Sequence, residues 1–211
     1  MRTLQCILIS LGWGLISPLF AIEVEKEVTY YTVTPNPGEA IFDSIVRDAP
    51  PSSHQFLNEK NASTLGEYQP KVEFETHFNT HLFKHCTVSR VDITLHSHFY
   101  LPKLNTHYNY SYSVTSDFNR EYRKILDHEE HHEAIYIFYL KELKKEIERL
   151  GRKRLACDDL SSQIKALEDK TLEKIDEENR LFDCREYGKK MGWTFCDAPK
   201  KRHLSNKLKS A

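Results

Sequence analysis

The sequence lacks the short motifs that mark several large classes of enzymes and binding proteins. It contains only seven glycines, and none of them forms a Gly-rich loop that would cradle a nucleotide phosphate. No serine lies in the G-x-S-x-G elbow of the α/β-hydrolases, and no internal repeat or low-complexity segment is present. These absences argue against a P-loop or dinucleotide-binding protein, a serine hydrolase of that type and a repeat protein.

An excess of charge of one sign is absent as well. The 30 basic and 31 acidic residues give a net charge of -1 at pH 7, which argues against nucleic-acid binding by the whole domain. We expect no nucleic acid among its partners. Residues 199–211 are locally basic, and we predict a flexible tail there, with binding to an anionic surface as the alternative. The basic residues of this tail are Lys200, Lys201, Arg202, Lys207 and Lys209.

Residues 1–21 have the order of features typical of a secretory signal peptide. Met1 and Arg2 make a short basic start, an apolar run follows, and the small Ala21 precedes charged residues. We expect cleavage after Ala21, export to the periplasm or the extracellular space, and no stable membrane insertion of the mature chain. An uncleaved membrane anchor is the alternative. Residues 22–198 then suffice for one domain.

Four cysteines remain once the predicted signal peptide is removed, and they lack the CxxC spacing of structural zinc sites. An even number of cysteines in an exported chain favours two disulfides over a metal cluster. We expect Cys86 to pair with Cys157 and Cys184 to pair with Cys196. Sequence alone allows three pairings.

The first part of the domain, residues 27–115, is predicted to be rich in strands. Residues 28–34 read as a strand, and residues 38–48 read as a short helix that Pro50 and Pro51 end. Apolar and polar residues alternate over residues 72–78 and 91–101, which predicts antiparallel strands with one face toward water.

The second part, residues 117–198, is predicted to be helical. One helix should run over residues 117–150 and end at Gly151. A second helix should start near Asp158 and Asp159, which suit its N-terminus. Its predicted core residues recur at helical spacing: Leu160, Ile164, Leu167, Leu172 and Ile175.

The first of these helices contains an HExxH motif within the run His128-Glu129-Glu130-His131-His132. Because a helix advances about 100° per residue, His128 and His132 lie one turn apart on one face and can bind a single zinc ion. Glu129 then acts as the general base toward a metal-activated water. This pattern points to metal-assisted hydrolysis, whereas His131 lies to the side of that face.

The two motif histidines share their face with an apolar stripe, which predicts that they point into the domain. The alternative is a pair of core histidines satisfied by a carbonyl or a carboxylate, because a buried imidazole needs a polar partner. The residues of the stripe are Ile125, Ile135, Tyr136, Tyr139 and Leu143.

A second pair, His96 and His98, lies on the polar face of a predicted strand, because strand side chains alternate with a period of two. Such a pair can bind a metal ion, but exposed histidines on a wet face are the commoner case. We therefore expect no metal site there.

The ordered set of motifs resembles the bacterial family DUF922, described as predicted secreted zinc-dependent proteases. The resemblance runs from Val28 to Phe195, most of the mature chain. It rests on the following residues in this order: Tyr30-Tyr31-Thr32-Val33, Cys86 to Val91, Leu101-Pro102, the HExxH run, Cys157 with Leu160, Phe182-Asp183, Gly188 and Gly192.

The resemblance implies that His128 and His132 are zinc ligands and that Glu129 is the catalytic base. The chain departs from the family near its end, where Tyr187 stands in place of an expected His. If that His is a metal ligand in the family, this chain lacks it, and an inactive protein that keeps the fold is the alternative.

The third zinc ligand must come from outside the HExxH helix. Glu142 and Glu146 lie about 15 and 21 Å further along that helix than His132, given a rise of about 1.5 Å per residue, so neither reaches the same ion. Asp183 is our first choice, because two histidines and one carboxylate complete a zinc site with one open position. Tyr187 is the second choice, as a ligand or as a catalytic donor to the oxyanion. A salt-bridged or helix-terminal carboxylate is the alternative for Asp183.

Taken together, these patterns predict a zincin-like α+β domain, with a small antiparallel sheet packed on the HExxH helix and on a second antiparallel helix. The predicted function is that of an exported zinc-dependent peptidase acting on a peptide or protein substrate. The alternatives are an inactive zinc-binding or envelope interaction protein, and a helical adaptor with a core His pair. The sequence shows neither a specificity pocket nor an oligomeric state.

Overall fold

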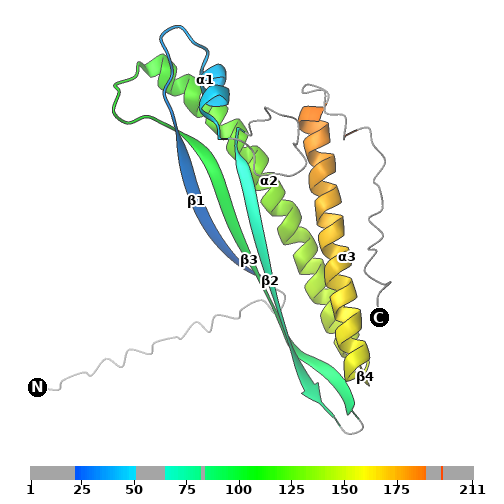
Figure 1. Ribbon diagram of the computed structural model, residues 1–211. Coiled ribbons are helices and arrows are strands. Elements are labelled where there is room, and N and C mark those ends of the chain that lie inside the picture. The colour runs from blue at the N-terminus through cyan, green and yellow to red at the C-terminus, as the bar shows by residue number, and fades with distance from the viewer. Residues whose placement is uncertain (1–21, 51–64, 82–83, 189–195, 197–211) are drawn as a thin grey trace, which may run out of the picture.

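The protein has an α+β fold, seen here in a computed structural model that describes residues 22–50, 65–81, 84–188 and 196. The predicted signal peptide, the basic tail and Gly192 lie outside these residues. The elements follow one another in this order (Figure 1): β1 (Glu23–Val33), α1 (Ile41–Asp48), β2 (Glu67–Thr80), β3 (His85–Leu104), α2 (Tyr112–Gly151), β4 (Leu155–Ala156), α3 (Cys157–Asp183) and the π-helix η3 (Cys184–Gly188).

The sheet is mixed, with the strand order β1-β3-β2 and the short β4 paired to β3. Strands β2 and β3 form an antiparallel pair, as expected, but β1 runs parallel to β3. The prediction of a purely antiparallel sheet was therefore wrong for β1. Alternation along a strand reports which face is buried and not the direction of the neighbouring strand. Direction is set by the connection, which here includes α1 and β2.

Strand β3 is the centre of the sheet and the main apolar surface on which the helices pack. Its odd-numbered residues from 91 to 101 are buried, among them Val91, Ile93, Leu95, Phe99 and Leu101, while the even-numbered residues between them are more exposed. This period of two is the pattern seen in the sequence. The strands are longer than predicted because β2 and β3 continue to pair beyond their alternating stretches.

Helix α2 has 40 residues, which corresponds to a length of about 60 Å. It starts earlier than predicted, because the hydroxyl of Ser111 accepts a hydrogen bond from the backbone N–H of Val114 and caps it. It ends at the predicted Gly151, where a Cβ atom would lie 2.4 Å from Cβ of Val88. No helix in the described ranges carries an apolar stretch long enough to cross a membrane.

Helix α3 turns back after Gly151 and lies alongside α2 (Figure 1). The two helices and the sheet share one core, in which the predicted Leu160, Ile164 and Ile175 are buried, with Leu167 and Leu172 packed against them. From α2, this core receives Leu140, Leu143, Ile147 and Leu150. The helical hairpin therefore brings the end of α3 back to the middle of α2.

Both predicted disulfides are present. Cys86 in β3 bonds to Cys157, the first residue of α3, and Cys184 bonds to Cys196. The first bond ties the sheet to the helical hairpin, whereas the second lies directly after α3.

We expect the double variant Cys86→Ser/Cys157→Ser to lose about 4 kcal/mol of unfolding free energy, because this bond closes a loop with a sequence separation of 71. The variant Cys184→Ser/Cys196→Ser, whose bond has a separation of 12, should lose about 3 kcal/mol. Urea denaturation at equilibrium measures both values. A midpoint equal to that of the wild type in the first variant would contradict the expectation.

Candidate metal centre

Three potential metal ligands from two helices converge on one point. Nε2 of His128 and Nε2 of His132 lie 3.1 Å apart. Oδ1 of Asp183 lies 3.2 Å from the first of these atoms and 3.0 Å from the second. The two His side chains are 10% and 12% exposed, so the group is largely shielded from water but remains reachable. This arrangement can hold a metal ion.

Helix geometry explains how the three side chains meet. His128 and His132 are one turn apart on α2, as the spacing predicted. Asp183 is the last residue of α3, and the antiparallel course of α3 carries it to the His pair. The structure thus brings Asp183, the first choice for the third ligand, together with both histidines.

The side chain of Asn179 orients His132. Its Oδ1 atom lies 2.9 Å from Nδ1 of His132, so the imidazole donates its Nδ1–H to this oxygen. In the metal-free protein the other ring nitrogen, Nε2, donates its proton to Oδ1 of Asp183. Without that proton, Nε2 presents a lone pair to the three-residue group, as a metal ligand requires. Sequence reasoning missed Asn179, although its position one turn before Asp183 on α3 places both on one helix face.

The ring of Phe182 packs among all three histidines of the motif. It stacks on His131 with a centroid distance of 3.9 Å and on His128 at 4.7 Å, and it meets the edge of His132 at 5.2 Å. Phe182 is buried, and it shields one side of the imidazoles from water. His131 is itself exposed and does not belong to the ligand group, in agreement with its predicted place beside the motif face.

Glu129 is buried between α2 and the start of β2, with 5% of its surface exposed. The backbone N–H of Tyr68 donates a hydrogen bond to its carboxylate. Burial raises the pKa of Glu129 to about 7, and the nearby charges of Asp183 and Glu67 act in the same direction. A carboxyl group of this kind can exchange a proton near neutral pH.

Asp183 carries a negative charge that the two histidines stabilise. Burial alone would raise its pKa, but hydrogen bonds from His128 and His132 hold it at about 2. In turn, although burial opposes it, the hydrogen bond and the charge of Asp183 raise the pKa of His132. The centre therefore favours positive charge beside Asp183, as a proton or as a metal cation.

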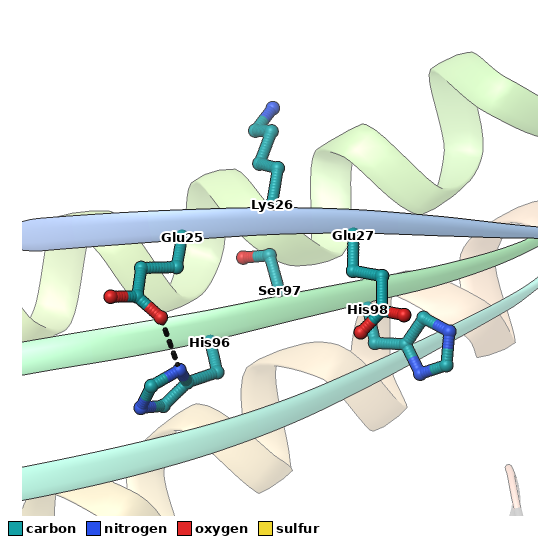
Figure 2. A pocket seen from close by; sticks show the side chains of 6 residues that line it. All are labelled: Glu25, Lys26, Glu27, His96, Ser97 and His98. Atoms are coloured by element: carbon teal, nitrogen blue, oxygen red, sulfur yellow. Dashed lines mark ion pairs between the residues drawn. The ribbon is translucent and has the colours of Figure 1, made fainter.

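Lys26 of β1 forms an ion pair with the HExxH helix, directly after the ligand candidate His132. Its Nζ atom lies 2.5 Å from Oε2 of the buried Glu133, the residue after His132. Figure 2 shows Lys26 pointing away from the side of the sheet that bears Glu25 and His96. Sequence reasoning missed this pair, because Lys26 and Glu133 are far apart in the chain.

His96 and His98 do not form a shared site on the outer face of the sheet (Figure 2). Nδ1 of His96 lies 2.9 Å from a carboxylate oxygen of Glu25, whereas Nε2 of His98 lies 2.8 Å from the hydroxyl of Thr29. The two imidazoles thus have separate partners.

A second group with metal-ligand chemistry lies further along the same sheet. Nε2 of His77 is 3.3 Å from Glu75 and 3.2 Å from Asp92. Arg90 bonds to both Asp92 and His77, at 2.7 and 3.0 Å. Because its guanidinium already supplies the positive charge, we read this group as a solvent-exposed ion-pair network.

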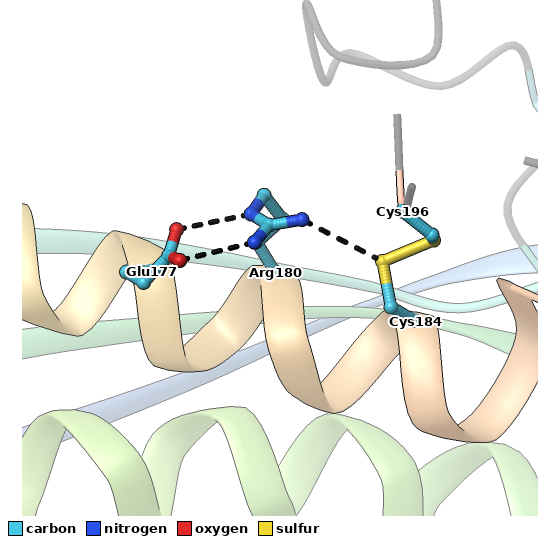
Figure 3. The surroundings of a disulfide bond; sticks show 4 residues. All are labelled: Glu177, Arg180, Cys184 and Cys196. Atoms are coloured by element: carbon cyan, nitrogen blue, oxygen red, sulfur yellow. Dashed lines mark hydrogen bonds and ion pairs between the residues drawn. A yellow bond between two sulfur atoms is a disulfide. The ribbon is translucent and has the colours of Figure 1, made fainter. Parts of the chain in front are cut away.

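Cys184, the residue after Asp183, forms the second disulfide with Cys196 (Figure 3). Arg180 forms two bonds to the carboxylate of Glu177, both 3.0 Å long, and its Nη1 lies 4.0 Å from Sγ of Cys184. Tyr187 lies in η3, but its side chain is outside the described part of the structure. Its predicted role as a ligand or oxyanion donor stays a prediction.

A comparison with profiles of protein families shows which family the chain matches. The profile of the family described as "Bacterial protein of unknown function (DUF922)" matches residues 28–189. The chain belongs to this family. The DUF922 match contains the HExxH motif, Asp183 and Tyr187. Searches of curated proteins and of solved structures gave no match.

Proposed function

We propose that this DUF922 protein is an exported zinc-dependent peptidase. The observation that carries the proposal is the triangle of donor atoms, whose sides measure 3.0 to 3.2 Å. In a tetrahedral zinc site with ligand distances of 2.0–2.1 Å, neighbouring donors lie about 3.3 Å apart. The three atoms therefore fit a zinc ion with little movement.

The kinds of ligand support a catalytic site more than a structural one. Structural zinc sites use four protein ligands, mostly cysteine and histidine, whereas two imidazoles and one carboxylate leave a fourth position open. The hydrogen bond from His132 to Asn179 is the kind of supporting contact that fixes a ligating imidazole. An HExxH helix beside a small sheet is also a zincin-like arrangement, and we extend the proposal to that fold.

Zinc bound at this centre would supply Lewis-acid chemistry, activating water and polarising a substrate carbonyl. Within the chain, His128, His132 and Asp183 would hold the ion. Glu129 would accept a proton and deliver it to the leaving amine, a role suited by its pKa of about 7 in the metal-free protein. Its hydrogen bond from Tyr68 and its burial fix the carboxylate for that transfer.

The position of β2 supports a peptide substrate. Among the strands in the described residues, β2 pairs with β3 alone, so it is an edge strand. Its first residues contact Glu129, which places backbone hydrogen-bonding groups of an edge strand beside the centre. An extended peptide pairs with such an edge through its main chain.

Export is supported by the two disulfides, because such bonds persist in oxidising compartments. Together with the signal-peptide pattern of residues 1–21, they favour the periplasm or the extracellular space. Mass spectrometry of the exported protein should find an N-terminus close to residue 22.

The second candidate function is zinc binding without turnover, as in an inactive envelope interaction protein. The observation that favours it is Tyr187, which stands where the family resemblance leads us to expect His. A wild-type protein that binds one zinc ion but cleaves no member of a broad peptide library would select this candidate.

Metal analysis of the full mature protein tests the proposal, with His132→Ala compared to His131→Ala. We expect about one zinc ion per chain in the wild type and in His131→Ala, and none in His132→Ala, because His132 belongs to the ligand group and His131 does not. Hydrolysis of unfolded casein should follow the zinc content. Equal zinc in all three proteins would refute the metal centre.

A further inference from the structure

A half-buried tyrosine in β1, Tyr31, contacts the segment that leads into β2. The hydroxyl of Tyr31 donates a hydrogen bond to the backbone carbonyl of Leu65 at 2.5 Å. Leu65 precedes the start of β2 at Glu67, so the sheet ladder does not hold this carbonyl. Tyr31 and Leu65 also pack against the same apolar cluster, which includes Ile125 of α2.

The residue after Leu65 lies directly against the proposed catalytic base. A Cβ atom on Gly66 would be 2.5 Å from Cγ2 of Ile125 and 2.9 Å from Oε1 of Glu129. Only glycine allows the backbone to come this close to the carboxylate. Two residues later, the backbone N–H of Tyr68 donates a hydrogen bond to the same carboxylate. The segment of residues 65–68 thus forms one wall around Glu129.

The hydrogen bond from Tyr31 connects this wall to the strand at the opposite edge of the sheet. Strand β1 lies at one edge and β2 at the other, with β3 between them. The partner of Tyr31 in β3 is Pro102, which is fully buried and has a compact ring. The long Tyr31 side chain therefore connects the β1 edge to the start of the β2 edge, next to Glu129.

We propose that Tyr31 is a positioning residue that holds the Leu65–Tyr68 segment against Glu129, so that the carboxylate keeps the orientation needed for proton transfer. This inference rests on the proposed function for its catalytic consequence. Its structural part, that the Tyr31 hydroxyl holds the segment in place, stands independently of any activity.

The test compares Tyr31→Phe with Tyr30→Phe in the full mature protein. The first change removes one hydroxyl and keeps the half-buried ring. The second is the matched control, because Tyr30 is the preceding residue of β1, is 48% exposed and forms its hydrogen bond with Tyr122 instead. Three quantities are measured: zinc content, kcat and KM for a cleaved peptide, and amide hydrogen exchange at Tyr68.

We expect Tyr31→Phe to keep its zinc, because the three candidate ligands are His128, His132 and Asp183 and the change leaves all three in place. Amide exchange at Tyr68 should be roughly 10-fold faster, while the amides of β3 and α3 should exchange at the wild-type rate. The kcat should fall roughly 10- to 100-fold with little change in KM, since a misplaced base slows the chemical step. Tyr30→Phe should match the wild type in all three measurements.

Wild-type exchange at Tyr68 in Tyr31→Phe would overturn the inference. A uniform acceleration of exchange across the domain would also overturn it, because Tyr31 would then act only on global stability. If the wild type hydrolyses no peptide, the proposed function fails, but the exchange measurement still decides whether Tyr31 holds the segment. If kcat is unchanged while exchange at Tyr68 rises, the positioning role in catalysis is refuted.

Discussion

Glu129→Gln is expected to lose about 1000-fold in peptide hydrolysis while it keeps one zinc ion per chain. Glutamine has nearly the same shape as glutamate, and its amide oxygen can still accept the hydrogen bond from Tyr68. It cannot accept the proton, however, and both imidazoles and Asp183 remain in place. Zinc content and steady-state kinetics on one protein preparation measure the two parts of the prediction.

Glu130→Gln is the matched control, because Glu130 is the adjacent residue of α2 and is exposed. It undergoes the same chemical change without contact with the centre, and its activity should equal that of the wild type. Full activity in Glu129→Gln would eliminate the catalytic assignment. Loss of zinc in Glu129→Gln would instead show that the carboxylate supports the metal centre itself.

Asp183→Ala is expected to lose both zinc and hydrolysis, with zinc affinity reduced more than about 100-fold. Even residues that only support a ligand change metal affinity by 10- to 100-fold, so the loss of a direct ligand should exceed that range. The change also removes the negative charge that lies 3.0 Å from His132 and 3.2 Å from His128. Competition with a fluorescent zinc chelator gives the affinity.

Asp169→Ala is the control for this variant, because Asp169 lies on the same helix, is exposed and forms an ion pair with Lys165. It should bind zinc with wild-type affinity. Wild-type affinity in Asp183→Ala would move the third ligand elsewhere, and Tyr187→Phe would then be the next variant to measure.

The sequence determined those features that depend on short-range periodicity and on composition. The spacing of His128 and His132 places them on one helix face in any α-helix, and their apolar neighbours predicted that this face turns inward. Alternation along β3 predicted its buried face. The even number of cysteines predicted two disulfides, and both expected pairs are present. The faces of the helix and the strand need only residues near one another, and the number of disulfides needs only a count, whereas a count leaves three pairings open.

The tertiary structure decided which distant residues meet. The packing of α3 on α2 brought Asp183, one of the two residues predicted as third ligand, to the His pair. Asn179 and Phe182 gained their contacts from the same packing. The parallel pairing of β1 and the approach of Gly66 to Glu129 also depend on how distant segments of the chain pack against one another. No local pattern encodes these contacts, because a helix or strand specifies its own faces but not the element that covers them.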